Sequence, residues 1–250
     1  MIIKEVNVKS AISKSKLPGL NYACNPYRGC EHGCIYCYSQ DVLHEKREWG
    51  KFVDVKINFF EVFKKDLEKL EKGVIGFGTV TDCYQPVEKK YEITRKCLEI
   101  LKEFDIPVCI QTKSSLILRD IKIISEMDSE IGITITSLEN WQTFEPKADT
   151  PEKRIEVLKN FHDIGIKTFL FIGPILPSTN PKEILEKCID FIDLVYVDKF
   201  RKKPILWERI KSAIKDEKTL DFLNKFPKEK VEEIEKICME KGVELRKAFG

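Results

Sequence analysis

The segment "EIGITITSLENWQTFEPKADTPEKRIEVLKNFHDIGIKTFLFIGPILP", residues 130–177, contains one strand, one helix and a second strand. Its first and last parts are apolar runs, which predict buried strands, and residues 150–165 between them have the periodicity of an amphipathic helix. Thr150 is a suitable N-cap, Pro151 suits the first helical position, and Gly165 is a suitable stop. Uniformly apolar strands that are joined by a helix predict a parallel sheet covered by helices.

The same alternation extends outward in both directions. Strand-like apolar runs occupy residues 20–25, 73–80, 106–113, 130–137, 166–177 and 193–200. The predicted helices that follow the last five of them occupy residues 87–104, 115–127, 150–165, 180–192 and 205–215. Six strands are too few for a complete eight-fold barrel. We therefore predict an α/β fold, an incomplete and open (β/α)6 barrel, in preference to a doubly wound sheet.

The regions outside this alternation are short. Residues 52–60 predict an extra strand with a helix after it, and residues 226–245 predict one capping helix. No linker or low-complexity segment separates these parts. The sequence therefore predicts a single domain over residues 1–250, with its core at about 20–200 and a helical C-terminal extension at 201–250.

Composition limits the classes of protein. The chain is 42% hydrophobic, and none of its apolar runs approaches the roughly 20 residues that a membrane span needs. The N-terminus has no signal-peptide pattern, so we expect a cytoplasmic protein. The net charge of +2 arises from 43 basic and 41 acidic residues that are mixed along the chain, so charge alone does not indicate nucleic-acid binding.

The nine cysteines are an odd number, and three of them lie close together in "NPYRGCEHGCIYCYSQ", residues 25–40. This pattern favours a ligand cluster over a disulfide framework. Cys30, Cys34 and Cys37 have the spacing CxxxCxxC, and three thiolates can bind three irons of a cubane cluster that normally takes four ligands. An open iron can bind a substrate or cofactor. Structural zinc, with Cys24 or His32 as the fourth ligand, and a closed electron-transfer cluster are the alternatives.

The cysteine spacing with Tyr36 before the third cysteine resembles the signature of the radical S-adenosylmethionine (SAM) superfamily. Further strings resemble, in order, the spore photoproduct lyase-related branch of that superfamily. They are "TVTDCYQPVE" (79–88), "QTKSSLILRD" (111–120), "ITITSL" (133–138), "FEPKADTPEKRIEVL" (144–158) and "GPILP" (173–177).

The resemblance implies that Cys30, Cys34 and Cys37 hold a 4Fe-4S cluster whose fourth iron binds the amino and carboxylate groups of SAM. One electron from a reductant such as ferredoxin or flavodoxin would cleave SAM to methionine and a 5'-deoxyadenosyl radical, which abstracts a hydrogen atom from substrate. By analogy with this branch the substrate is expected to be a nucleic acid or nucleotide. Radical modification of a small molecule or of a protein is the alternative.

The resemblance also implies a SAM pocket at the carboxyl ends of the strands. Lys113 is expected to pair with the SAM carboxylate, and Tyr36 to present its backbone to the adenine. Hydroxyl groups for the ribose or amino acid part of SAM would come from Thr134, Thr136 and Ser137, although alternating threonines are also good strand formers. The other expected contacts are Thr79, Thr81, Asp82 and Glu145. Asp82 is expected either to accept from the SAM ammonium or to cap the next helix, and the sequence does not separate the two roles.

The hydrogen donor departs from the branch pattern. Aligning "TVTD" with the matching segment of spore photoproduct lyases puts Thr79 where those enzymes have a donor cysteine. Cys83 is therefore a candidate donor and Cys24 is another, with burial as small apolar side chains as the alternative. Tyr84 and Gln85 are expected to face the substrate. Basic residues interleaved with aromatics over 198–215 suit either a phosphate backbone or a solvated helix face.

Overall fold

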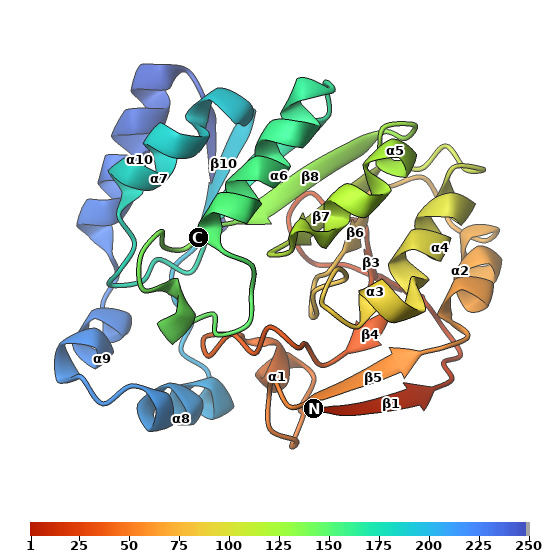
Figure 1. Ribbon diagram of the computed structural model, residues 1–250, viewed down its shortest axis with the longest axis horizontal. Coiled ribbons are helices and arrows are strands. Elements are labelled where there is room, and N and C mark those ends of the chain that lie inside the picture. Colours follow the sequence, from red (N-terminus) through yellow and green to blue (C-terminus); the bar gives the residue numbers. More distant parts are fainter. Residues whose placement is uncertain (249–250) are drawn as a thin grey trace.

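The computed structural model describes residues 1–248, and its central element is an eight-stranded sheet (Figure 1). Six neighbouring strands run parallel and correspond to the six predicted apolar runs. They are β3 (Tyr22–Cys24), β6 (Ile75–Phe77), β7 (Val108–Thr112), β8 (Ser129–Thr134), β9 (Lys167–Ile172) and β10 (Leu194–Val197). The α/β class and the open, incomplete barrel are confirmed.

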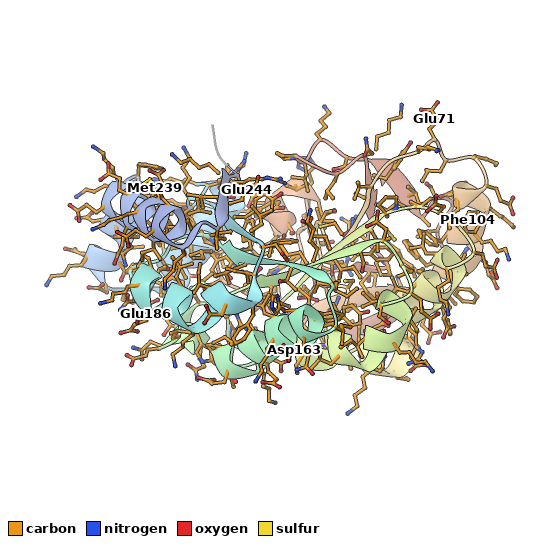
Figure 2. The ribbon with its side chains drawn as sticks, turned by 90° about the horizontal axis from the view of Figure 1, so that it is seen from above. Glu71, Phe104, Asp163, Glu186, Met239 and Glu244 are labelled. Carbon is orange, nitrogen blue, oxygen red and sulfur yellow. The ribbon has the colours of Figure 1, made fainter. Side chains whose placement is uncertain are left out.

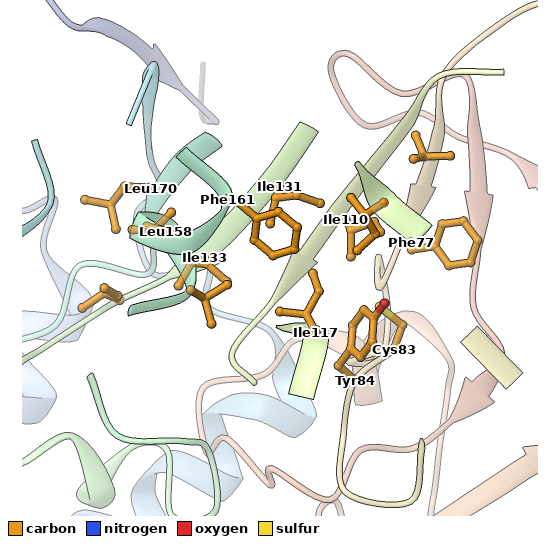
Figure 3. Packing of buried hydrophobic residues seen from close by; sticks show 14 of the residues in the cluster. Phe77, Cys83, Tyr84, Ile110, Ile117, Ile131, Ile133, Leu158, Phe161 and Leu170 are labelled. Carbon is orange, nitrogen blue, oxygen red and sulfur yellow. The ribbon is translucent and has the colours of Figure 1, made fainter. Parts of the chain in front are cut away.

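Helices connect these strands and cover the sheet (Figures 1 and 2). They are α4 (Ile93–Leu101), α5 (Ile121–Ile124), α6 (Pro151–Asp163) and α7 (Pro181–Cys188) with the 3-10 turn η3 (Ile189–Phe191). The helix predicted after the last strand, α8 (Pro204–Ala213), does not cover the sheet and lies near α1 (Ser39–Val42) (Figure 1). Thr150 caps α6 by accepting from the backbone N–H of Lys153, and Pro151 is its first residue, as predicted. Leu158 and Phe161 of this helix lie in one buried cluster with Ile131 of β8 (Figure 3).

Two predicted helices are broken by local polar groups. The helix predicted at 87–104 divides into α3 (Glu88–Tyr91) and α4, because Glu92 between them is left-handed, with φ of 52°. The Glu88 carboxylate accepts hydrogen bonds from backbone N–H groups in the first turn of α4. In a continuous helix these N–H groups would bond to carbonyls of the preceding turn. The helix predicted at 115–127 begins as the 3-10 turn η1 (Ser115–Asp120), where the Ser114 side chain accepts from Leu116 N–H, and only then becomes α5.

The sheet has two edge strands that the sequence did not predict. The strand β2 (Ile12–Lys14) pairs antiparallel with β3. At the other edge β11 (Glu244–Lys247) runs parallel to β10. The capping helix predicted at 226–245 is confirmed as α10 (Lys228–Lys241), but its last residues belong to β11 because Gly242 takes a left-handed conformation and ends the helix.

The predicted extra strand and helix are β5 (Phe52–Lys56) and α2 (Phe59–Leu67). The strand belongs to a separate three-stranded sheet, in which it pairs parallel with β1 (Ile2–Val6) and antiparallel with β4 (Tyr27–Arg28). Since β4 leads directly into the cysteine segment, this small sheet fixes where that segment begins.

Short helices gather at the carboxyl ends of the barrel strands. They are α1 (Ser39–Val42), the 3-10 turn η2 (Trp141–Thr143), α8 and α9 (Glu217–Asn224). Figure 1 shows α1, α8 and α9 at the same end of the molecule, and α1 contacts α8. No helix within residues 1–248 combines the length and the apolarity that a membrane crossing requires.

Candidate functional site

The cysteine loop runs from β4 to α1 and folds tightly against β5. Gly29 has φ of +87°, and a Cβ there would lie 2.4 Å from the carbonyl oxygen of Phe52, so only glycine fits this position. Cys30 and Cys34 are buried, and Cys37 is half-buried. The backbone N–H of Cys37 donates to the carbonyl of Cys34 at 3.1 Å, which closes the turn between these two thiols.

The three thiols are close enough to influence one another. Burial raises the pKa of Cys30 well above its ordinary value, and the neighbouring Asp82, Cys34 and Cys37 raise it further. Burial likewise raises the pKa of Cys34 to about 12, and Lys113 opposes that rise. All nine cysteines of the chain are free thiols in the described structure. Three thiols from one loop that form no disulfide are suitable donors for a metal cluster.

Within residues 1–248, no three His, Cys, Asp or Glu side chains converge closely enough to hold a single metal ion. A cubane cluster does not need such convergence, because each cysteine binds a different iron atom. The donor set and the chain path of the cysteine loop therefore fit a cubane cluster.

Asp82 lies beside Cys30 and connects two strand ends. Its carboxylate accepts from the hydroxyl of Thr112 at 2.7 Å, from the backbone N–H of Lys113 at 2.9 Å and from that of Tyr84 at 2.9 Å. Its backbone N–H acts on the Cys30 thiol in the direction that lowers the pKa, against the larger effect of burial. Three protein donors thus occupy the Asp82 carboxylate, which fixes the loop after β6 to the end of β7.

Thr81 and Gln85 hold the backbone on both sides of Cys30. The Thr81 hydroxyl donates to the carbonyl of Gly29 at 2.6 Å, and the Gln85 side chain accepts from the backbone N–H of Glu31 at 2.8 Å. The Gln85 amide also donates to Gly29 and Thr81, and Gln85 is fully buried. Gln85 therefore supports the cysteine loop and does not face substrate, contrary to the sequence expectation.

Thr79 lies on the other side of the same loop. Its hydroxyl accepts from the Asn25 side chain at 2.8 Å, and its carbonyl accepts from the Tyr38 hydroxyl at 3.1 Å. Thr79 thus joins the loop after β6 to both ends of the segment that carries the cysteines.

Cys83 and Tyr84 lie in the hydrophobic core, both with 0% exposure (Figure 3). The Tyr84 hydroxyl donates to the Asp120 carboxylate at 3.1 Å. For Cys83 this position matches the packing role that the sequence left open, and burial raises its pKa well above the ordinary thiol value. The hydrogen-donor role of Cys83 and the substrate-facing role of Tyr84 gain no support from this burial and stay predictions.

Four buried side chains meet at the mouth of the barrel, and we call Tyr36, Thr136, Glu145 and Arg154 the mouth cluster. Tyr36 donates to the Glu145 carboxylate, and Thr136 donates to it at 2.8 Å. Arg154 Nη1 lies 2.5 Å from Glu145 Oε2, and both side chains have 0% exposure. The mouth cluster is therefore a buried ion pair with hydroxyl donors, directly beside the cysteine loop.

Arg154 was missed by sequence reasoning because it lies on a helix that carries many charges. Its guanidinium donates to the carbonyl of Asp149 at 2.7 Å and to that of Thr134 at 3.1 Å. The available signal was its position three, four and seven residues before Val157, Leu158 and Phe161, on the apolar face of α6. An arginine on such a face is buried and needs buried partners.

The mouth cluster has buried polar atoms that no group in residues 1–248 satisfies. Arg154 Nη2 has no hydrogen-bond partner, and Glu145 Oε2 meets only its ion pair with Arg154 Nη1. Outside the cluster, His32 Nδ1 forms no hydrogen bond and lies 3.5 Å from Asp82 Oδ2. Most buried polar groups of folded proteins are hydrogen-bonded. The free guanidinium nitrogen of Arg154 fits a ligand that carries an acidic group, as an amino acid does.

Lys113 adds a second positive charge to this mouth. Its Nζ lies 5.6 Å from the centre of the Tyr36 ring. Burial alone would raise the pKa of Glu145, but Arg154 and Lys113 together with the Tyr36 hydrogen bond hold the pKa below its ordinary value. Glu145 is therefore a carboxylate at neutral pH and can accept from a ligand ammonium.

The predicted hydroxyl residues at the end of β8 and just after it are all buried and engaged within the protein. Thr134 accepts from the Gln111 amide at 3.0 Å, and Ser137 donates to the carbonyl of Ser178 at 3.0 Å. Thr136 contributes to the mouth cluster. The structure thus brings Tyr36, Lys113, Thr136 and Glu145 together, while Ser137 holds a neighbouring loop.

The helix α8 closes the outer side of the cysteine loop. The Asp41 carboxylate accepts from the backbone N–H groups of Ile205 at 3.0 Å and Leu206 at 2.9 Å, at the start of α8. Arg209 donates to the carbonyls of Ile35, at 2.9 Å, and of Cys37, and to the Gln40 side chain at 2.6 Å. These contacts were not predicted, because they join residues more than 160 positions apart.

Comparisons with known proteins agree with this arrangement. The family model described as the radical SAM superfamily matches residues 24–191. An uncharacterized protein of Methanocaldococcus jannaschii is 36% identical over 202 residues, which cover 78% of this chain and 71% of that protein.

Solved structures of spore photoproduct lyase share the fold. One with bound AdoMet and dinucleoside spore photoproduct has a TM-score of 0.71 at 16% identity and covers 97% of this chain and 80% of that one. Another, complexed with dinucleoside spore photoproduct, has a TM-score of 0.67 at 17% identity and covers 84% of this chain. In that alignment the chain spans 66% of the lyase.

Proposed function

Because the chain belongs to the radical SAM superfamily, we propose that Cys30, Cys34 and Cys37 hold a 4Fe-4S cluster and that SAM binds beside it at the mouth of the barrel. Bound together, the cluster and SAM supply a one-electron cleavage that generates a 5'-deoxyadenosyl radical for hydrogen abstraction from a substrate. The observation that carries the proposal is the mouth cluster, a fully buried ion pair that leaves one guanidinium nitrogen, Arg154 Nη2, without a hydrogen bond next to the three-cysteine loop.

The residues of the mouth have distinct proposed roles. Lys113 and Arg154 provide positive charge for the carboxylate of SAM, and Glu145 accepts from its ammonium group. Tyr36 and Thr136 hold the Glu145 carboxylate in place. A pocket whose charges are fixed before the ligand arrives does not need to reorganise during the reaction.

The remaining predicted residues act around that pocket. Asp82, Thr79 and Thr81 keep the cysteine loop in its conformation, and their donors and acceptors are occupied by protein groups. Thr134 and Ser137 line the end of β8 and its loop, where we retain them as proposed neighbours of SAM. Neither Cys83 nor Tyr84 is required by this proposal.

We propose a nucleic acid or nucleotide as the substrate. Near the mouth α8 and the residues before it carry Lys202 over the ring of Trp207, at 4.1 Å, with Phe200 beside the same ring. Aromatic and basic side chains in alternation suit stacked bases and phosphates. The dinucleoside bound in the spore photoproduct lyase structures is compatible with this choice.

We also propose an electron donor, a cellular location and a domain organisation for this enzyme. An external one-electron reductant such as ferredoxin or flavodoxin is needed, and nine free thiols favour the reducing cytoplasm. We propose that the chain acts as one domain. Within residues 1–248, Asp41 and Arg209 support this by attaching the C-terminal extension to the cysteine loop of the core, and residues 249–250 lie outside the described structure.

The decisive test is anaerobic reconstitution with iron and sulfide, followed by dithionite and SAM, with 5'-deoxyadenosine measured by mass spectrometry. We expect wild-type protein to produce it and Cys34→Ala to lose both the cluster and the product. Cys109→Ala, which removes a half-buried thiol from β7, is the matched control and should keep both. Wild-type protein that binds iron or zinc but yields no 5'-deoxyadenosine would support the non-catalytic alternative.

A test of the substrate class follows from the same assay. SAM cleavage should place deuterium from a labelled oligonucleotide or nucleotide into 5'-deoxyadenosine. Label transfer from a peptide or small metabolite, with none from nucleic acid, would contradict the proposed substrate while leaving the radical chemistry intact.

A further inference from the structure

Residues 45–54 form a fixed wall against the cysteine loop. Gly50 has φ of +83°, and a Cβ on it would lie 2.8 Å from the Cα of Gly33 inside the loop. Arg47 pairs with Glu45 at 2.8 Å and with Asp54 at 2.7 Å. Backbone contact on one side and ion pairs on the other leave this wall little freedom to move.

Trp49 stands in the middle of this wall. It forms an apolar cluster with Cys30 and Phe52, and Cys37 packs against the same cluster. Its side chain is 5% exposed, and its ring lies edge-on to that of Phe52 with the centres 6.1 Å apart. Two of the three proposed cluster ligands thus share one water-poor surface with this indole.

The indole N–H of Trp49 is buried and has no hydrogen-bond partner among residues 1–248. Buried tryptophan N–H groups usually find an acceptor, and each buried polar group without one requires an explanation. The apolar side chains around Trp49 offer none, and the carboxylates of Glu45 and Asp54 are occupied by Arg47. Because Cys30 and Cys37 pack with this side chain, a group bound between Trp49 and the cysteine loop can supply the acceptor.

We propose that the Trp49 indole N–H donates a hydrogen bond to a sulfur atom of the cluster held by Cys30, Cys34 and Cys37 and thereby raises its reduction potential. The inference rests on the proposed function, since it requires the cluster. Hydrogen bonds to the sulfurs are among the factors that set the potential of iron–sulfur clusters. A donor stabilises the reduced state because reduction adds negative charge. Trp49 is in this sense a positioning and tuning residue.

The first test is a potentiometric titration of reconstituted wild-type protein and Trp49→Phe, which keeps an apolar ring and removes the N–H. We expect Trp49→Phe to keep the cluster and to lower the equilibrium constant for its reduction about tenfold, which is a shift of about 59 mV to more negative potential for one electron. Phe52→Leu trims the same apolar cluster without removing a donor, and its potential should stay close to that of wild type. Equal potentials for wild type and Trp49→Phe, or equal shifts in both variants, would overturn the inference.

A second readout applies even if Trp49→Phe binds the cluster poorly. The chain has three tryptophans, so wild-type protein with 15N-labelled tryptophan can be reduced and examined by pulsed paramagnetic resonance. A weak 15N coupling is expected in wild type and in Trp207→Phe. Its absence from a wild-type protein that binds the cluster and cleaves SAM would reject the inference and leave the proposed function standing. A wild-type protein that binds no cluster would reject both.

Discussion

Two buried groups of ion pairs in this protein differ in how completely they are satisfied. We call Glu88, Asp120, Arg119 and Arg95 the scaffold cluster. All four of its carboxylate oxygens accept hydrogen bonds. In the mouth cluster Arg154 Nη2 donates no hydrogen bond within residues 1–248 and Glu145 Oε2 meets only its ion pair with Arg154, although both side chains have 0% exposure and the arginines of the scaffold cluster are partly exposed.

The difference distinguishes a network that stabilises the fold from a network that can bind a ligand. A completed buried network stabilises one arrangement of the chain, whereas an incomplete one retains the cost of its unpaired atoms until a ligand supplies partners. The scaffold cluster joins α3, η1 and, through Tyr27, the strand that leads into the cysteine loop. The mouth cluster lies beside that loop and is incomplete, as expected of a ligand site.

The largest expected effect comes from breaking the scaffold cluster. Arg119→Met leaves the buried carboxylates of Glu88 and Asp120 without their main cation. Loss of one partner from a buried pair costs about 3–5 kcal/mol of folding free energy. At about 2–4 °C per kcal/mol for a chain of this size, the melting temperature should fall by roughly 6–20 °C.

Calorimetry or thermal circular dichroism measures this fall, and Arg246→Met on the exposed edge strand is the control that should change little. The dissociation constant of SAM for the folded variant should match that of wild type. A variant with normal stability and weakened SAM binding would reverse the roles that we assign to the two clusters.

The next effect should appear in the mouth cluster as a loss of SAM affinity. Glu145→Gln keeps the shape of the side chain and removes the charge that we expect the SAM ammonium to meet. Hydrogen bonds to charged groups contribute about 1.5–3 kcal/mol, so the affinity of the reconstituted protein should fall about 10-fold to 100-fold. Equilibrium dialysis under anaerobic conditions measures it, with the exposed Glu139→Gln as the control.

The pH dependence of this effect follows from the charge on Glu145. Its pKa is held below the ordinary carboxyl value, so the group stays ionised above that value and is protonated only as the pH falls through the lowered pKa. The ratio of wild-type to Glu145→Gln affinity should therefore be constant from about pH 8 to about pH 6. A ratio that declines across this interval would show that Glu145 is protonated in the folded protein.

A smaller loss is expected for the second cation of the mouth. Lys113→Met removes one positive charge near Glu145 and Cys34, while Arg154 remains to face the SAM carboxylate. We expect the SAM dissociation constant to rise about 3-fold to 10-fold, which is about 0.7–1.4 kcal/mol. Lys122→Met on the exposed face of α5 is the matched control. An unchanged constant would leave Arg154 as the sole cation of the proposed site.

The barrel could be predicted from the sequence because its signals are local. Apolar runs, amphipathic periods and the Thr150–Pro151 cap each specify their own element, and repetition of the unit specifies the parallel sheet. Glu92 and β11 could not be predicted in this way. A left-handed Glu92 depends on the Glu88 carboxylate within the scaffold cluster, and β11 depends on pairing with β10, which lies 50 residues earlier.

The candidate site likewise combines residues that could be predicted from the sequence with residues that only the fold reveals. The three cysteines were predicted from their spacing and Lys113 from its strand-end position, whereas Glu145 was expected only from the resemblance of its segment to the family branch. Arg154 was hidden on a charged helix, and the burial of Tyr84 and Gln85 follows from packing that no local pattern encodes. The fully satisfied and the incomplete networks have similar residue types, so only the structure separates them.

The smallest expected effect concerns the hydrogen bonds that Arg209 donates to uncharged acceptors of the cysteine loop and α1. Arg209→Lys keeps the charge but loses the planar fork that joins the carbonyls of Ile35 and Cys37 to the Gln40 side chain. The folding free energy of the cluster-free protein should change by about 1 kcal/mol, because lysine keeps a charged donor for one of these acceptors and the site is only half-buried. The cysteine loop should nevertheless open more often, and iron release to a chelator should become about 2-fold to 5-fold faster, a difference of about 0.4–1 kcal/mol in the barrier.

Iron release is followed by the colour of a ferrous chelate, with Lys211→Arg on the exposed side of the same helix as the control. Equal release rates would mean that Asp41 alone holds α8 against the loop. A large fall in stability would instead place Arg209 with the scaffold cluster, among groups whose main role is to hold the fold together.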